Sequence, residues 1–272
     1  MISSAGLRLA LAAPARLAGW RSHWTTVAGV RIHERVRASS PDTLPVVLLH
    51  GLAVSHRYLM PTAHALSARH PVHVPDLAGF GLSGKPRRAL DVRAHTELVS
   101  AWLEARGLDR ICVVGHSFGA EIAAALARHR PGLVAALVLG GPTSDPAARS
   151  RHGLIRRWFA DLLVEDPRQA AILARDVRDA KPWRIAATVG HSVRNPVEED
   201  LMHVTSPTLV VGGGWDRVAP ARWRHQVAGL CGGAAVTIPG AGHNVLTTAG
   251  HRSAGVIADH LGAITRARPA IG

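Results

Sequence analysis

A serine flanked by glycines is the first feature of this chain that could do chemistry. Ser117 lies at the centre of the segment GHSFG, residues 115–119, which has the pattern GxSxG. An apolar run typical of a buried strand precedes it at 111–114, and an alanine-rich run typical of a helix follows at 118–129. A serine in this context is expected on a tight strand-to-helix turn that projects its hydroxyl away from the sheet. The flanking glycines have no Cβ to crowd such a turn, so Ser117 is the candidate nucleophile.

A serine hydroxyl is a weak nucleophile at neutral pH, so it needs a base within hydrogen-bond reach and a third group that orients the base. His243 is the candidate base because it lies in a glycine-rich loop, 239–244, after the last expected strand. Asp216 is the candidate acid because it lies in a loop, 213–220, after the preceding strand. The order serine, aspartate, histidine along the chain is the one expected for a nucleophile on a strand-to-helix elbow.

Strands and helices that alternate along the chain must position these three residues. Such alternation predicts an α/β fold in which helices cover both faces of a parallel sheet. The expected strands lie at 27–33 as a hairpin and at 45–51, 72–76, 111–115, 133–139, 208–211 and 235–238, and the expected helices lie at 92–106, 118–129, 221–230 and 245–264.

The alternation is interrupted between residues 142 and 200. This segment is helical in tendency, is interrupted by prolines at 142, 146, 167, 182 and 196, and carries 10 basic and 9 acidic residues. We therefore expect a helical cap at 142–200, inserted into a core made of 1–141 and 201–272. The near balance of charge indicates no preference of the cap for anionic substrates.

Five short segments together resemble the α/β-hydrolase superfamily, over residues 25–261. They are HG at 50–51, DLAGFGLS at 76–83, GHSFG at 115–119, GGWD at 213–216 and GH at 242–243. The resemblance implies the α/β-hydrolase fold, with a mostly parallel eight-stranded sheet flanked by helices and a helical cap inserted after the sixth strand.

The resemblance also implies a role for each site residue. Ser117 would attack a carbonyl carbon, His243 would take and return the proton, and Asp216 would orient and stabilise the imidazolium. The oxyanion hole would consist of the backbone N–H groups of Phe118 and Leu52, aimed at the negative charge that develops in the transition state.

Three other carboxylates invite comparison with the candidate acid. Asp145 follows an earlier strand-like run and is a rival for the same role, but the pattern around Asp216 matches the family better. Asp76, at a strand end beside glycines, is interpreted as a structural hydrogen-bond acceptor. Glu121, one turn along the helix that follows the serine, is interpreted as a helix-surface group or a neighbour of the site.

Five further side chains are candidates for contact with substrate. His50 and His116 flank the site and are expected to support its loops. Trp158, Phe159 and Trp183 of the cap could form walls of a pocket, although packing in the core explains such aromatic residues equally well.

A serine at the elbow argues against haloalkane dehalogenases and epoxide hydrolases, which use an aspartate there. The favoured reaction is therefore hydrolysis of a small ester, thioester or lactone through an acyl-enzyme. Carbon-carbon bond hydrolases and haloperoxidase-like perhydrolases share the same motifs and stay open as alternatives. A non-catalytic small-molecule receptor on the hydrolase scaffold is the alternative from another class.

Composition excludes several other partners. The formal net charge is +13, yet the basic residues are spread along the chain with neither a cluster nor a nucleic-acid-binding motif, so no nucleic acid is expected. No apolar run reaches the roughly 18 residues that a membrane span needs, so no membrane is expected. Residues 1–20 are expected to form a short helix or extension rather than a signal peptide.

Neither a metal nor a cofactor is expected. The histidines lack Cys, Asp or Glu companions at ligand spacings, and no GxGxxG segment opens a helix. The cysteines at 112 and 231 do not suggest a disulfide framework, which favours a reducing, cytoplasmic location. A small-molecule substrate is the one expected partner, and the chain is expected to be a monomer or homodimer.

Overall fold

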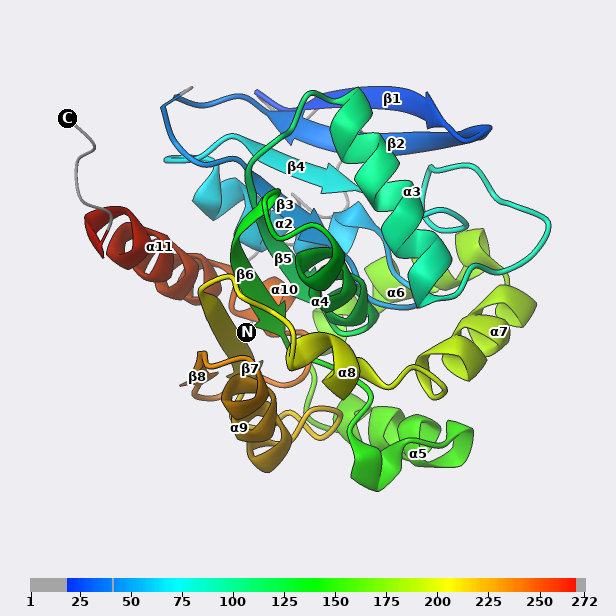
Figure 1. Ribbon diagram of the computed structural model, residues 1–272. Coiled ribbons are helices and arrows are strands. Elements are labelled where there is room, and N and C mark those ends of the chain that lie inside the picture. Colours follow the sequence, from blue (N-terminus) through cyan, green and yellow to red (C-terminus); the bar gives the residue numbers. More distant parts are fainter. Residues whose placement is uncertain (1–18, 41, 268–272) are drawn as a thin grey trace.

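An eight-stranded sheet forms the centre of the molecule, with strand order β1-β2-β4-β3-β5-β6-β7-β8. The computed structural model describes residues 19–40 and 42–267 (Figure 1), so the expectation for residues 1–20 lies almost entirely outside the described residues. The strands are β1 (Arg21–Val27), β2 (Val30–Arg37), β3 (Val46–Leu49), β4 (Val72–Pro75), β5 (Ile111–His116), β6 (Val134–Gly140), β7 (Thr208–Gly213) and β8 (Ala234–Ile238).

The expected hairpin is formed by β1 and β2, which pair antiparallel. Its two turn residues, Ala28 and Gly29, have φ of 45° and 73°, as a tight two-residue hairpin turn requires. β2 also pairs antiparallel with β4, and all later neighbours pair parallel. The parallel strands therefore end at one shared edge of the sheet, where loops can bring distant residues together.

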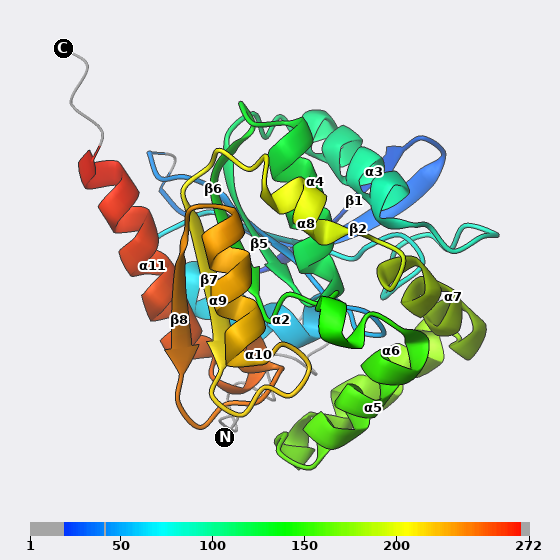
Figure 2. The same cartoon turned by 60° about the horizontal axis from the view of Figure 1, so that its bottom comes forward.

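Helices cover both faces of this sheet, as the alternation predicts (Figures 1 and 2). One face packs on α3, α4, α8 and α9, and the other packs on α2, α10 and α11. The bounds are α2 (His56–Leu66), α3 (Val92–Ala105), α4 (Phe118–His129), α8 (Val197–Leu201), α9 (Ala221–Leu230), α10 (Val245–Thr248) and α11 (Gly250–Ala267).

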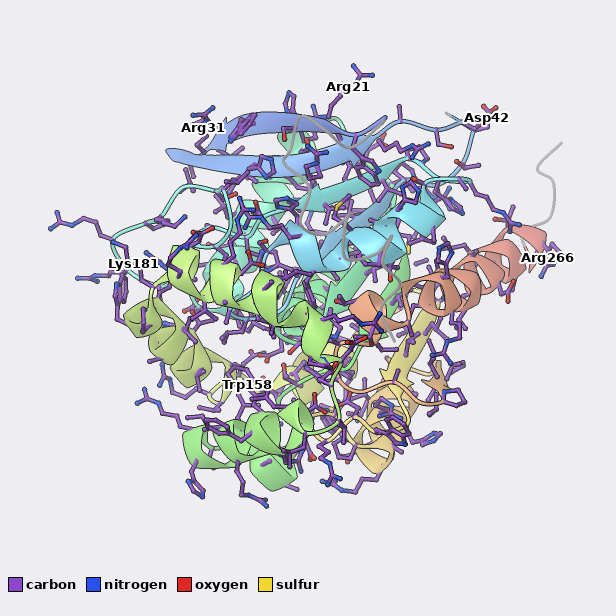
Figure 3. All side chains as sticks on the ribbon, turned by 180° about the vertical axis from the view of Figure 1, so that it is seen from behind. Arg21, Arg31, Asp42, Trp158, Lys181 and Arg266 are labelled. Carbon is purple, nitrogen blue, oxygen red and sulfur yellow. The ribbon has the colours of Figure 1, made fainter. Side chains whose placement is uncertain are left out.

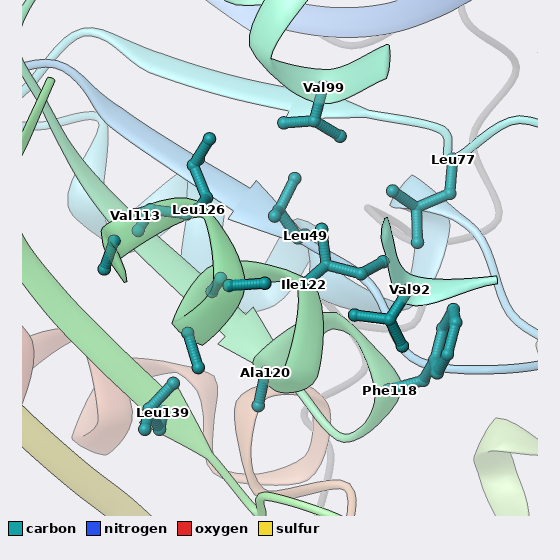
Figure 4. Close-up of a cluster of buried hydrophobic side chains, with 14 of the residues drawn as sticks. Leu49, Leu77, Val92, Val99, Val113, Phe118, Ala120, Ile122, Leu126 and Leu139 are labelled. Carbon is teal, nitrogen blue, oxygen red and sulfur yellow. The ribbon is translucent and has the colours of Figure 1, made fainter. Parts of the chain in front are cut away.

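The central strands β3, β5 and β6 are mostly apolar on both sides because each side faces a helical layer. In β3, Leu49 belongs to the core cluster under α3 and α4, whereas Leu48 belongs to the cluster under α2 and α11. Figure 4 shows Leu49 of β3 next to Ile122 of α4, and Val113 of the neighbouring strand β5 on the side of Leu126. This double-sided burial fixes the register of the strands and so the positions of their ends.

Two details of the helices differ from the expectation. The single helix expected at 245–264 is two helices, α10 and α11, which meet at Ala249. Gly250 opens α11 where a Cβ would lie 2.7 Å from the Pro61 side chain, so the close approach of α2 and α11 sets this break. The helix α2 is not among the expected helices, because an interior proline such as Pro61 is typical of a helix end.

The segment between β6 and β7 is helical, as expected for a cap. Pro146, Pro167 and Pro182 stand at the first turn of η2, η3 and α7, where the missing N–H has no helical partner to lose. α5, α6 and α7 lie together beyond the edge of the sheet (Figure 2). The cap elements are η2 (Pro146–Ala148), α5 (Arg151–Leu162), η3 (Pro167–Gln169), α6 (Ala170–Ala180) and α7 (Pro182–Ser192), followed by α8. Within the described residues, the helices are all too short or too polar to cross a membrane.

Candidate active site

Ser117 lies on the turn between β5 and α4, and its backbone is strained. Its φ is 55° and its ψ is −120°, a conformation that costs a residue with a side chain about 1–3 kcal/mol. The glycines of the motif are required by close packing: a Cβ on Gly115 would collide with the carbonyl oxygen of Gly119, and a Cβ on Gly119 would lie 2.6 Å from the carbonyl oxygen of His50. The spacing GxSxG therefore follows from the geometry of the turn.

The structure brings the three candidate residues together from distant parts of the chain. Nε2 of His243 lies 3.0 Å from Oγ of Ser117. Nδ1 of His243 lies 3.2 Å from each carboxylate oxygen of Asp216. Oδ1 of Asp216 also accepts the backbone N–H groups of Val218 at 2.9 Å and Ala219 at 2.7 Å. These bonds fix the carboxylate on its loop. The carboxylate in turn holds the imidazole through Nδ1, the ring nitrogen that faces away from Ser117.

The charges of Asp216 and His243 favour an ionised aspartate and a basic histidine. Burial lowers the pKa of His243, but the charge of Asp216 and the hydrogen bond to it outweigh that effect and raise it. Burial in turn raises the pKa of Asp216, but His243 and the N–H of Ala219 lower it below its usual value. The arrangement therefore stabilises a proton on His243 when one arrives from Ser117.

The two backbone N–H groups expected to form the oxyanion hole belong to Phe118 and Leu52. Phe118 is the first residue of α4, where an N–H has no acceptor within its own helix. Leu52 follows Gly51, which packs against the serine so closely that a Cβ there would lie 3.0 Å from Cβ of Ser117. Among the described residues, no backbone acceptor takes the N–H of Leu52.

His50 and His116 are buried, and both ring nitrogens of each already have partners. Nδ1 of His50 donates to the carbonyl of Gly51 at 2.8 Å, and its Nε2 accepts the N–H of Leu77 at 2.9 Å. Nε2 of His116 donates to the carbonyl of His243 at 2.9 Å, and its Nδ1 is hydrogen-bonded to the hydroxyl of Tyr58. These two residues therefore hold the loops of the site and leave no ring nitrogen to bind substrate.

The three aromatic candidates of the cap differ in their surroundings. Trp158, labelled in Figure 3, is half-buried and packs against the core cluster. Phe159 is 67% exposed, and Trp183 is 49% exposed with the guanidinium of Arg184 at 4.6 Å from its ring centroid. Phe159 and Trp183 therefore lie at the surface of the cap, and Trp158 stays the one candidate with a buried face.

The rival acid, Asp145, faces arginines instead of a histidine. Its Oδ2 accepts from Arg157 at 2.7 Å and from Arg222 at 2.6 Å. Glu121 is fully buried and accepts hydrogen bonds from Thr143 at 2.7 Å and from Asn195 at 2.9 Å, so it ties α4 to the cap rather than lying on a helix surface.

One group of side chains in the described part of the chain has metal-ligand character. Nitrogen atoms of His33 and His56 and an oxygen of Asp76 lie within 4.8 Å of one another, and all three residues are buried. In this structure the same atoms are hydrogen-bonded, since Nδ1 of each histidine lies 2.9 Å from the carboxylate of Asp76. This group was not expected from the sequence, because the three residues belong to separate segments with no ligand-like spacing.

Two cap residues near the candidate acid and base were also not expected from the sequence. The carboxylates of Asp161 and Glu165 accept backbone N–H groups of the loops that follow β7 and β8. No local motif marks them, because each partner lies more than 50 residues further along the chain.

Comparisons with known proteins agree with this architecture. A family model described as alpha/beta hydrolase fold matches residues 45–199. Haloalkane dehalogenase 2 of Mycobacterium tuberculosis is 29% identical over 158 residues, which are 58% of this chain and 53% of that protein. The chain therefore spans only part of the curated relatives it matches, between 35% and 53% of their length in the two cases compared.

Solved structures share the fold over nearly the whole chain. A membrane phospholipase A, described as a bacterial virulence factor, superposes with a TM-score of 0.79 at 23% identity and covers 97% of this chain and 90% of its own. A thermophilic esterase from Thermogutta terrifontis superposes with a TM-score of 0.76 at 23% identity and covers 90% of this chain and 99% of its own.

Proposed function

The chain belongs to the α/β hydrolase fold family, and on that premise we propose that it is a serine hydrolase that cleaves a small ester, thioester or lactone. One observation carries the proposal: His243 lies between the hydroxyl of Ser117, at 3.0 Å, and the carboxylate of Asp216, at 3.2 Å. A base so placed and so oriented is what converts a serine hydroxyl into a nucleophile.

The proposed reaction has two steps that share the same base. In the first, Oγ of Ser117 attacks the substrate carbonyl while its proton passes to Nε2 of His243. The oxyanion accepts hydrogen bonds from the N–H groups of Leu52 and Phe118. Collapse breaks the bond to the leaving group, which takes the proton from His243 and departs, so that an acyl group is left on the serine.

Water completes the reaction in the second step. His243 takes a proton from water, and the resulting hydroxide attacks the acyl carbonyl at the same oxyanion site. Collapse releases the carboxylic acid and returns the proton to Ser117. Asp216 stabilises the imidazolium that forms in each step and keeps Nε2 directed at the serine.

The residue at the elbow decides between this chemistry and that of one relative. Displacement of a halide from an alkyl carbon needs a carboxylate nucleophile at that point, and this chain has the hydroxyl of Ser117. A serine supports acyl transfer from a carbonyl compound, which favours esters over haloalkanes.

A substrate panel tests the proposal. Purified protein is assayed with p-nitrophenyl esters of increasing acyl length, lactones and thioesters, and a fluorophosphonate probe reports the reactivity of Ser117. Turnover and labelling that both disappear in Ser117→Ala support the serine hydrolase. Labelling without turnover, together with tight binding of a small molecule, would instead favour a receptor. Turnover that survives in Ser117→Ala would overturn the acyl-enzyme mechanism.

A further inference from the structure

One short stretch of the cap contacts both loops that position the candidate acid and base. Asp161, in the last turn of α5, accepts the N–H of Arg217 through Oδ1 at 3.1 Å. Arg217 directly follows the candidate acid. Glu165, four residues further on, accepts the N–H of Asn244 through Oε1 at 2.6 Å. Asn244 directly follows the candidate base, so each loop is held next to its functional side chain.

A third cap residue completes the contact with the histidine loop. Gln169 donates from Nε2 to the carboxylate of Glu165 at 2.7 Å and accepts the side-chain amide of Asn244 at 2.9 Å. Asn244 is therefore held at both its backbone and its side chain. A Cβ on Gly242 would lie 2.7 Å from Oε1 of Glu165, so this glycine makes room for the carboxylate to reach the loop.

We propose that Asp161 and Glu165 are positioning residues of the hydrolytic reaction, which hold the acid loop and the base loop in the register that places His243 between Asp216 and Ser117. The inference rests on the proposed function of this site. It assigns the cap a part in catalysis, because the same segment holds the loops of two residues that reach the site from the core.

The charges around Glu165 support such a role. Burial and the neighbouring charge of Asp161 raise the pKa of Glu165 to about 7, against the N–H of Asn244, which lowers it. Both carboxylates in turn help raise the pKa of His243, although less than Asp216 does. Glu165 thus interacts electrostatically with Asp161, His243 and the buried hydroxyl of Tyr58, and Asp216, Arg217, Asp166, Arg168 and Arg252 line the same cavities as Glu165.

Two substitutions of Glu165 separate the hydrogen bond from the charge. Glu165→Gln keeps an oxygen that can accept the N–H of Asn244, whereas Glu165→Ala removes it. A misplacement of a reacting group by about 1 Å can cost roughly 100-fold in rate, so we expect kcat per active site to fall about 10- to 100-fold in Glu165→Ala and to recover to within about threefold of the parent in Glu165→Gln. Glu199→Gln, at an exposed carboxylate of α8, is the matched control and should behave as the parent chain.

The measurement is kcat and KM across pH, normalised by titrating active serines with a fluorophosphonate. A fall in kcat with little change in KM, reversed in Glu165→Gln, supports positioning. Loss of one negative charge should also move the acid limb of the profile to lower pH in both variants, because His243 then loses its proton more readily. Two variants that only lower the melting temperature, with kcat per active serine and the pH profile unchanged, would overturn the proposal.

Failure of this inference and failure of the proposed function give different results. If turnover survives in Ser117→Ala, the hydrolase mechanism is wrong and the role of Glu165 falls with it. If Ser117→Ala is inactive and Glu165→Ala matches the parent, the mechanism stands and the cap carboxylates are structural.

Discussion

Asp76 and Asp216 both lie buried beyond the carboxyl end of a strand, and both accept a hydrogen bond from Nδ1 of a histidine. In one cluster Nδ1 of His33 lies 2.9 Å from Oδ2 of Asp76, and in the other Nδ1 of His243 lies 3.2 Å from Oδ1 of Asp216. The far nitrogen of each histidine faces a serine hydroxyl, at 3.1 Å in the cluster of Asp76 and at 3.0 Å in the cluster of Asp216. The described part of the chain thus contains two hydrogen-bonded rows of serine, histidine and aspartate.

The backbone around the serine separates the two clusters. Ser117 sits at positive φ beside the first N–H groups of α4, where an oxyanion can be stabilised. Ser22 belongs to the extended strand β1, and its Oγ accepts a hydrogen bond from Arg35 at 3.0 Å. The proposed mechanism requires more than a hydrogen-bonded row of three side chains, because donors for the developing negative charge must be in place as well.

The charges around the histidines separate the clusters further. Burial lowers the pKa of His56, the second histidine on Asp76, to about 4, since Asp76 only partly offsets the burial and His33 and Arg57 lower it further. Burial acts on His243 in the same direction, but the surrounding carboxylates reverse the effect. The surroundings of His243, the proposed base, therefore favour its protonated form, whereas those of His56 favour the neutral form.

Of the substitutions that test this comparison, Ser117→Ala is expected to have the largest effect. Removal of the nucleophile in a triad lowers kcat by about 10⁶-fold, because the base and acid then have nothing to activate. Turnover of the best ester in the panel measures the loss, and intact-mass analysis after fluorophosphonate treatment measures labelling. We expect no adduct on the variant, and an adduct of unchanged stoichiometry would move the nucleophile elsewhere in the chain.

Asp216→Asn should have the next largest effect. The amide cannot orient or stabilise the imidazolium as the carboxylate does, and such a change lowers kcat by about 10⁴-fold. Activity needs the neutral form of His243, so the rate falls as pH drops through its pKa. Because the charge of Asp216 raises that pKa, the acid limb of the residual activity should move to lower pH in the variant. An acid limb that stays in place would mean that the pair is not coupled as described.

The proximity of Ser117, Asp216 and His243 follows from patterns that are local in the sequence. Ser117 follows an apolar strand and is bracketed by glycines that no other residue could replace on such a turn. Asp216 and His243 follow strands in glycine-containing loops, and their order along the chain matched one known architecture. The alternation of strands and helices was visible for the same reason, since period and length are local properties of the sequence.

Features that depend on distant contacts could not be predicted. The helix α2 contains Pro61 and is stable because α11 packs on it, which no local pattern reveals. The cluster of His33 and Asp76 joins two strands 43 residues apart, and Glu165 reaches a loop 79 residues further on. Each of these pairings exists only once the sheet has set the register of its strands.

Asp76→Asn is expected to destabilise the fold more than any other change at the cluster of Asp76. Asp76 accepts from both histidines and from the backbone N–H groups of His56 and Leu82, at 2.8 to 2.9 Å. Removal of one partner from a buried charge network costs about 3–5 kcal/mol, and urea unfolding measures the loss. Asp109→Asn, at an exposed carboxylate, is the control. Unchanged unfolding would show that the hydrogen bonds of Asp76 contribute little.

Ser22→Ala should have the smallest effect, and it tests the comparison most directly. The change removes one side-chain hydrogen bond to His33 and one to Arg35 at a partly exposed position, which is worth about 1 kcal/mol in the free energy of unfolding. Because Ser22 has neither a strained turn nor adjoining oxyanion donors, we expect kcat, KM and fluorophosphonate labelling to match the parent chain. Reduced labelling would mean that a serine on an ordinary strand reacts through a histidine and an aspartate alone, and the elbow would then not be what distinguishes Ser117.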